Sequence, residues 1–258
     1  MLLTVDIGNT NIVIGIYSEG EWLNTWRVQT STDRTADEYS IILDSLFSQQ
    51  NRSYNGLENM IISSVVPQLT ASFKTILRQK TGVEPLVLHG ALDTGIAVKA
   101  RDPQTVGADL VADAVAAYDY FKETCIVVDF GSATTVMAIE EPGVFLGGAI
   151  GSGLKITTDA LVERTAQLTQ IPLEPPEKAI GRNTVEAMQS GLVLGHLCMV
   201  EGLIERMRKE LGTQAKVVAT GGLSSTVAPY TDYFDQVDPM LTLNGMRLVA
   251  ERVNRDEN

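Results

Sequence analysis

Hydrophobic and polar positions along this chain follow two periods, one typical of strands and one of amphipathic helices. Residues 4–17 read TVDIGNTNIVIGIY, which places two apolar, β-branched runs on either side of a polar turn. Strand patterns return at 22–28 and 59–66, and helical spacing of apolar residues follows each of them, at 34–48 and 69–80. An initial meander followed by alternating helices and strands predicts an α/β fold, with a mixed sheet and helices on its faces.

The opening pattern recurs in the second half of the chain. Asp129-Phe130-Gly131-Ser132 aligns with Asp6-Ile7-Gly8-Asn9 at an offset of 129 − 6 = 123 residues, and 143–146 (GVFL) aligns with 20–23 (GEWL) at the same offset. A unit of strand, Asp-x-Gly loop, strand, glycine turn and strand therefore occurs twice. Such a repeat predicts two similarly folded domains that arose by duplication, and we place them at 1–118 and 119–258.

The two Asp-x-Gly loops carry residues suited to binding phosphate. A glycine lets backbone N–H groups approach an anion closely, Asn9 and Thr10 add side-chain donors, and Asp6 offers a hard oxygen to Mg²⁺. One such loop taken alone is equally compatible with a tight hairpin that ends in an acidic residue. The repetition favours ligand binding, because a hairpin kept only for packing would have little reason to repeat its polar turn.

Two further sites have a functional and a structural interpretation. Asp109 falls in the first turn of a predicted helix, where it is either a carboxylate stabilised by the helix dipole, by about 0.3 to 1 kcal/mol, or a general base. Gly221 and Gly222 follow a predicted strand at 216–220. They are either a plain strand-to-helix turn or a place where a flat nucleoside lies against the backbone.

Composition limits the class of partner. The chain has 258 residues, 44% of them hydrophobic and 20% charged, which is typical of a globular protein with a sizeable core. Its net charge of −12 argues against a nucleic-acid partner. Cys125 and Cys198 are expected to be free thiols. We find neither an uninterrupted apolar run of about 18 residues nor a signal-peptide pattern, and therefore expect no membrane association and a cytoplasmic location.

Seven motifs in order along the chain are similar to those of type III pantothenate kinases, in the actin, Hsp70 and sugar-kinase superfamily: DIGNT at 6–10, SSVVP at 63–67, VGAD at 106–109, DFGSATT at 129–135, GGAI at 147–150, GRNT at 181–184 with QSG at 189–191, and TGG at 220–222. The resemblance implies two duplicated actin-like (ribonuclease H-like) domains, each with a mixed five-stranded sheet, and an ATP cleft between them. It also implies ATP-dependent phosphorylation of pantothenate to 4'-phosphopantothenate, the first step of coenzyme A biosynthesis.

The resemblance further assigns roles to residues at the matching positions. Asp109 would be the catalytic base, Asp6 would hold Mg²⁺, and Asp129 would help to bind a monovalent cation, K⁺ or NH₄⁺. Both loops and the glycine pair would bind ATP, through Asp6, Gly8, Asn9, Thr10, Asn11, Gly131, Ser132, Thr134, Thr135, Gly221 and Gly222. Pantothenate would contact Gly107, Ala108, Asp109, Arg101 and Thr184. Thr184 would act across a homodimer, because family members share their substrate pockets between subunits.

Three departures from the family pattern fall on the substrate side. The family usually has arginine directly after the catalytic aspartate, tyrosine where this chain has Ala100, and Pro-Gly where it has Ser152-Gly153; here Leu110 replaces the arginine. Arg101 or Lys99 is our hypothesis for the replacement cation. Two alternatives therefore stay open, namely a kinase of the same fold with a changed substrate, and a non-catalytic paralogue akin to members described as accessory factors for transcription.

Overall fold

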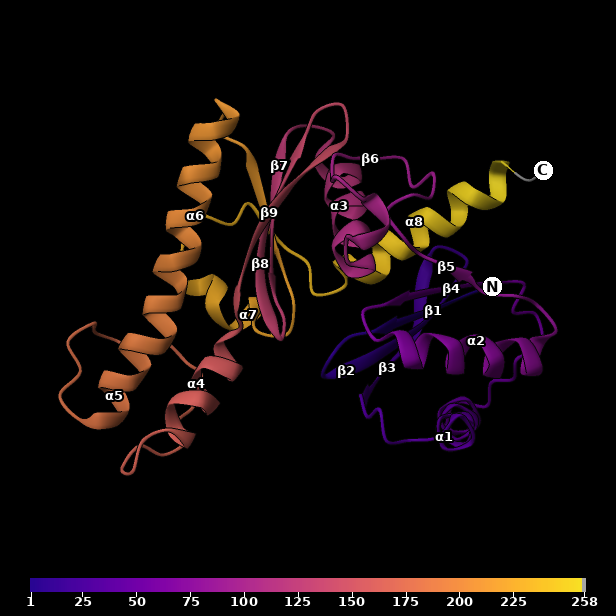
Figure 1. The fold of residues 1–258 in the computed structure, drawn as a ribbon, viewed down its shortest axis with the longest axis horizontal. Coiled ribbons are helices and arrows are strands. Elements are labelled where there is room, and N and C mark those ends of the chain that lie inside the picture. The colour runs from indigo at the N-terminus through magenta and orange to yellow at the C-terminus, as the bar shows by residue number, and fades with distance from the viewer. Residues whose placement is uncertain (257–258) are drawn as a thin grey trace. The chain divides into compact units, whose positions relative to one another are not determined.

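The computed structural model describes residues 1–256, which form two compact units (Figure 1). The first unit comprises residues 1–116 together with the chain from Thr242 onward, and the second comprises Ala117–Leu241. Each unit contains its own sheet and its own cluster of buried apolar side chains.

The first unit is built on a mixed five-stranded sheet in the order β3-β2-β1-β4-β5. Strands β1 and β2 form an antiparallel hairpin, β2 also pairs with β3, and β1 lies parallel to β4, which pairs with β5. The strand bounds are β1 Leu2–Ile7, β2 Asn11–Ser18, β3 Glu21–Gln29, β4 Asn59–Ser64 and β5 Leu86–Val87. A two-residue strand, β6 Ala97–Val98, is not part of this sheet. The predicted meander and the following parallel strand are both present.

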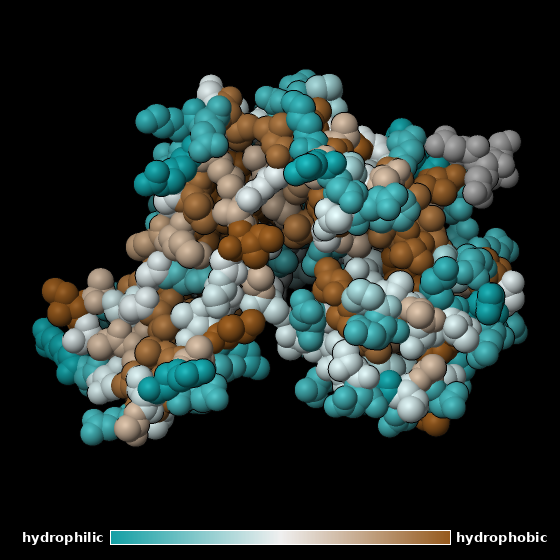
Figure 2. Space-filling view, in the orientation of Figure 1, coloured by the Kyte–Doolittle hydropathy of each residue, from teal (hydrophilic) through white to brown (hydrophobic). Residues whose placement is uncertain are grey.

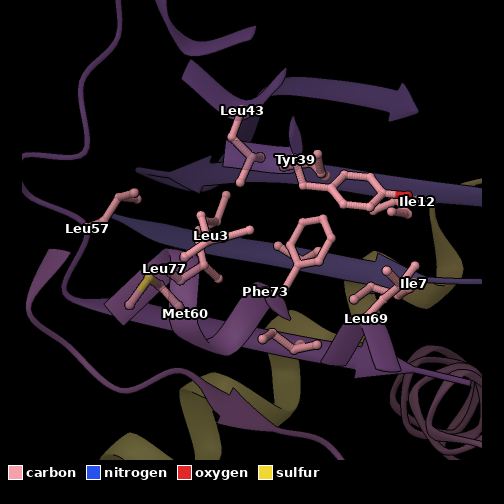
Figure 3. Packing of buried hydrophobic residues seen from close by; sticks show 14 of the residues in the cluster. Leu3, Ile7, Ile12, Tyr39, Leu43, Leu57, Met60, Leu69, Phe73 and Leu77 are labelled. Atoms are coloured by element: carbon pink, nitrogen blue, oxygen red, sulfur yellow. The ribbon is translucent and has the colours of Figure 1, made fainter. Parts of the chain in front are cut away.

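The first unit also contains helical elements, two of which, α1 and α2, supply buried side chains to the core of this sheet. The helical elements are α1 Ala36–Gln49, α2 Pro67–Thr81, the 3₁₀ turn η1 Pro103–Thr105, α3 Ala108–Phe121 and α8 Leu241–Asp256. A capping box at Thr35 and Glu38 starts α1, and Pro67 stands at the first position of α2. Tyr39 of α1 and Phe73 of α2 lie with their ring centroids 5.2 Å apart among the buried residues of β1 and β2 (Figure 3).

The C-terminal helix α8 belongs to the first unit, whereas the predicted second domain, 119–258, includes it. Asn244 Oδ1 accepts a hydrogen bond from Trp22 Nε1 at 2.9 Å. A Cβ atom on Gly245 would lie 1.9 Å from the carbonyl oxygen of Ala112, so the backbones of α8 and α3 are in direct contact. Close packing permitted by a glycine, together with the burial of Met246 and Val249, explains this assignment.

The second unit repeats the topology of the first. Its strands run in the order β11-β10-β7-β8-β9, with β7, β8 and β9 antiparallel and with β10 and β11 parallel to β7. The strand bounds are β7 Cys125–Phe130, β8 Ala133–Glu140, β9 Val144–Ser152, β10 Lys216–Thr220 and β11 Gln236–Val237. The helices are α4 Leu154–Glu163, α5 Thr184–Gln189, the π-helical segment η2 Ser190–Leu194, α6 Gly195–Leu211, α7 Ser224–Val227 and the 3₁₀ turn η3 Ala228–Tyr230. The predicted duplication of a mixed α/β fold is confirmed.

Helices α5, η2 and α6 form one continuous helix, Thr184–Leu211, and it is the one candidate for a membrane span, by length and composition, in the part of the chain that the structure describes. One face of this helix packs into the core of the second unit through Val193, Leu197, Val200 and Ile204. The core helix of a globular domain meets the same criteria, so we interpret it as part of the fold.

Candidate functional site

The first loop, Asp6–Asn11, is held by backbone and side-chain hydrogen bonds inside the first unit. The N–H of Gly8 donates to the carbonyl of Asn11 at 3.0 Å, and Thr30 Oγ1 donates to the carbonyl of Gly8 at 2.8 Å. The N–H of Thr30 donates to the carbonyl of Thr10 at 2.9 Å. The loop backbone is therefore fixed, while the side chains of Asn9 and Thr10 are exposed.

Asp6 stands at the end of β1, next to Ser63 of the parallel strand β4. Ser63 Oγ donates to Asp6 Oδ1 at 2.8 Å, and Ser63 is fully buried. This hydrogen bond orients the carboxylate of Asp6 at the carboxyl end of two parallel strands. Ser63 has no predicted role, although it belongs to the SSVVP motif, because the register between β1 and β4 is not visible in the sequence.

Asp109 lies in the first turn of α3, as predicted, and is half-buried. Its Oδ1 accepts a hydrogen bond from the N–H of Leu110 at 2.8 Å. Burial raises the pKa of the Asp109 carboxyl, and the backbone hydrogen bonds partly oppose this shift. A Cβ atom on Gly107 would lie 2.5 Å from Asp109 Oδ1, so the carboxylate occupies space that only glycine leaves open. A raised pKa brings a carboxylate closer to the range that suits a general base.

The residues predicted to bind pantothenate occupy both units. Arg101, Gly107, Ala108 and Asp109 lie in the first unit, where Arg101 is exposed and Ala108 is buried. Thr184 lies in the second unit, at the start of α5, whose N-cap Asn183 accepts a hydrogen bond from the N–H of Glu186 at 2.9 Å. It borders an open, largely apolar groove of about 620 Å³ lined by Leu161, Leu168, Gly181, Arg182, Asn183, Thr184, Ala187, Met188, Gly191 and Leu192.

The second loop, Asp129–Thr135, joins β7 to β8. In the strand register Asp129 is opposite Thr135 and beside Thr220, so these three side chains share one face of the sheet. The Oγ1 atom of Thr135 is buried and has no hydrogen-bond partner among the described residues. A buried hydroxyl next to a carboxylate offers two oxygen atoms to a water molecule or a cation.

Thr134 has different surroundings, because successive residues of a strand point to opposite faces. Its Oγ1 lies 2.9 Å from His196 Nε2 of α6. Both threonines are predicted to bind phosphate, and His196 is not among the predicted site residues. Nothing in the sequence signalled the histidine, which is 62 residues away from Thr134.

Glycines bring other segments close to the second loop. A Cβ atom added at Gly221, whose φ is +89°, would lie 2.3 Å from Asp129 Oδ1 and 2.6 Å from backbone atoms of Phe130. Gly153 donates its N–H to the carbonyl of Ser132 at 3.1 Å and would place a Cβ atom 2.2 Å from that oxygen. The turn after β10 and the start of α4 therefore both lie directly against the loop.

A sequence model of the type III pantothenate kinase family matches residues 2–206. The chain belongs to this family. A type III pantothenate kinase of Moorella thermoacetica is 45% identical over 252 residues, covering 98% of this chain and 99% of that protein. One from Thermomicrobium roseum is 44% identical over 255 residues, covering 99% of this chain and 98% of that protein. The predicted family resemblance is confirmed over essentially the whole chain.

Solved structures of more distant proteins share the fold of this type III pantothenate kinase family member. A Campylobacter jejuni protein, named provisionally as a Baf family transcriptional activator, has a TM-score of 0.63 at 19% identity and covers 98% of this chain and 99% of its own. Component A of (R)-2-hydroxyglutaryl-CoA dehydratase from Acidaminococcus fermentans has a TM-score of 0.52 at 14% identity, and the match covers 100% of this chain and 99% of that protein. At such identities these matches establish the fold alone, and they confirm the predicted fold class.

Proposed function

We propose that this chain transfers the γ-phosphoryl group of ATP to pantothenate, giving 4'-phosphopantothenate in the first step of coenzyme A biosynthesis. The observation that carries the proposal is the full-length similarity to type III pantothenate kinases, at 44% and 45% identity. ATP is a cytoplasmic substrate, so we expect the enzyme to act in the cytoplasm.

Asp109 is the group that activates the acceptor. In its ionised form it takes the proton of the pantothenate hydroxyl, and the resulting oxygen attacks the γ-phosphorus in line while ADP leaves. Its raised pKa follows from its burial, and Gly107 leaves room for the carboxylate in the observed position. Such a reaction depends mainly on positioning and charge neutralisation, which fits a helix start as a rigid support.

The two loops hold the triphosphate. Asn9, Thr10 and Asn11 of the first loop, and Gly131, Ser132, Thr134 and Thr135 of the second, supply amide and hydroxyl donors, and Gly221 and Gly222 face adenosine. Asp6 suits Mg²⁺, because its carboxylate is fixed by Ser63 and hard oxygen ligands are those that Mg²⁺ prefers. Mg²⁺ neutralises charge on the phosphates when it is bound.

Asp129 and Thr135 are candidates for a monovalent cation, K⁺ or NH₄⁺. Both offer oxygen atoms on one face of the sheet, and the hydroxyl of Thr135 is buried without a partner in residues 1–256. A weakly hydrated cation next to the carboxylate would satisfy this hydroxyl.

The active enzyme is a homodimer in which Thr184 contributes to the pantothenate site of the partner subunit. Apolar side chains remain exposed on the second unit, at Ile150, Ile156, Ile180, Val185 and Met199, and Figure 2 shows such side chains over the region of α4 and α5. Met199 lies against β9, since the Cβ position of Gly151 is 3.6 Å from Met199 Cε, whereas the neighbouring Ile150 points to the opposite face of the sheet. A second copy of the chain packed on α6 would cover Met199.

A coupled ADP-release assay tests the proposal. We expect ADP release that requires pantothenate, rises with K⁺ and is lost in Asp109→Asn. Absence of pantothenate-dependent release with and without K⁺ would reject the assignment. Release with other hydroxy acids or amides but not with pantothenate would instead identify a changed substrate, which Leu110 and Ala100 motivate. Sedimentation velocity of Met199→Glu tests the dimer, which this charge should weaken.

A further inference from the structure

His196 is the second residue of α6, which follows the π-helical segment Ser190–Leu194. It falls on the same stripe of the helix as Val193 and Val200, which are buried against the sheet of the second unit. An imidazole on such a stripe needs a polar partner, because burying an unpaired polar group is costly. The partner is Thr134, whose Oγ1 lies 2.9 Å from His196 Nε2.

Thr134 lies where β7 and β8 meet the turn of the second loop. Thr134 is 2% exposed and is opposite Phe130 in the register of β7 and β8, so these two residues close the base of the turn at 131–133. His196 touches both sides of that base, since its ring centroid is also 6.2 Å from that of Phe130. A single side chain of α6 therefore holds the two strand ends from which the second loop projects.

We propose that His196 is a positioning residue for ATP binding, acting through the hydroxyl of Thr134 on the second loop. The proposal rests on the proposed function, in that this loop binds the phosphates of ATP. When His196 donates from Nε2 to Thr134 Oγ1, the threonine keeps its own proton to donate elsewhere, and its side chain is held in one rotamer. Burial lowers the pKa of His196, so the ring is neutral and one nitrogen alone carries the proton.

The experiment compares three replacements of His196 in steady-state kinetics. The amide nitrogen of Gln reaches the place of Nε2, that of Asn does not, and Leu offers no polar atom. We expect His196→Leu to raise the KM for ATP about three- to tenfold, the size of one lost hydrogen bond, and to leave the KM for pantothenate unchanged. His196→Gln should restore the KM for ATP and His196→Asn should not.

Thr231→Val is the matched control. It removes another hydroxyl that bonds to α6, because Thr231 Oγ1 donates to Glu201 Oε1 at 2.7 Å, and it should leave the KM for ATP unchanged. In a double-mutant cycle, Thr134→Val combined with His196→Leu should raise the KM for ATP no more than Thr134→Val alone, because His196 acts through the Thr134 hydroxyl.

The outcomes separate the two proposals. Equal KM values for ATP in the Gln, Asn and wild-type enzymes would overturn the role of His196 while pantothenate phosphorylation stood. If the wild-type enzyme released no ADP with pantothenate, the proposed function would fail, and calorimetric titration of each variant with ATP alone would still test His196. A Leu variant that does not fold leaves the Gln and Asn comparison intact. If the effects of Thr134→Val and His196→Leu on the KM for ATP added up in the double mutant, the proposal would also be overturned.

Discussion

Replacing Gly221 by alanine should destabilise the second unit through two separable causes. The first is conformational, because φ of +89° is a conformation that non-glycine residues adopt only with strain. The second is steric, because the new methyl group would lie 2.3 Å from Asp129 Oδ1 and 2.6 Å from backbone atoms of Phe130. Backbone atoms at the end of β7 are held by strands on both sides and cannot yield as a flexible side chain would.

Gly212 separates these causes. It ends α6 with φ of +68° and its Cβ position has no neighbour within 4 Å, so Gly212→Ala carries the backbone strain without the clash. Strain in the left-handed region costs about 1 to 2 kcal/mol for a non-glycine residue. Overpacking costs about 1 to 3 kcal/mol more. We therefore expect the free energy of unfolding of Gly221→Ala to be about 1 to 3 kcal/mol below that of Gly212→Ala.

Urea denaturation of both variants measures this difference. Both glycines lie in the second unit, so the same transition reports both changes even where the two units unfold separately. The KM for ATP should rise in Gly221→Ala alone, because the carboxylate of Asp129 has to move. Equal unfolding free energies, within about 0.5 kcal/mol, would refute the close contact between Gly221 and the second loop.

Three further changes test the first unit. Gly107→Ala should lower kcat several-fold with little loss of stability, because its methyl group displaces the Asp109 carboxylate; unchanged kcat would contradict this. Burial raises the pKa of Asp109, so the midpoint of the acid limb in the pH profile of kcat/KM should lie above the ordinary pKa of an aspartate. Because the pKa of Asp109 is higher in the folded than in the unfolded protein, its ionisation lowers the free energy of unfolding above the folded pKa and has no effect below the unfolded pKa. Asp109→Asn should therefore be more stable than the wild type at pH 7, and this difference should disappear as the pH falls toward 3.8. Thr242 Oγ1 donates to the buried Asp113 at 2.7 Å, so Thr242→Val should lose about 1 to 3 kcal/mol in thermal or urea unfolding and Thr242→Ser much less.

The sequence was sufficient to predict the duplicated α/β fold and the loops at Asp6 and Asp129. Local signals carried these predictions, because a strand pattern, a glycine turn and a constant offset of 123 residues are visible without knowledge of contacts. The placement of Asp109 in a first helical turn followed from the same kind of signal.

Contacts between distant segments were not predictable in this way. Ser63 meets Asp6 through a parallel strand register, and His196 meets Thr134 through the packing of a helix on a sheet. The close packing of α8 on α3 in the first unit requires a glycine at position 245, and the sequence does not distinguish this glycine from any other small residue in a helix. Alternation of faces in β8 likewise separates Thr134 from Thr135, although they are adjacent in the chain.

The first unit is formed by two segments, residues 1–116 and the chain from Thr242 onward, whereas the second is one uninterrupted segment, Ala117–Leu241. During synthesis on the ribosome, the second unit therefore has all its residues once Leu241 has emerged. The first unit, although translated earliest, has to wait for Thr242 onward before α8 can pack its Gly245 against α3. The usual order in which the N-terminal part of a nascent polypeptide matures first is thus reversed, because the turns of α8 that finish the half carrying Asp109 are made after the whole second unit.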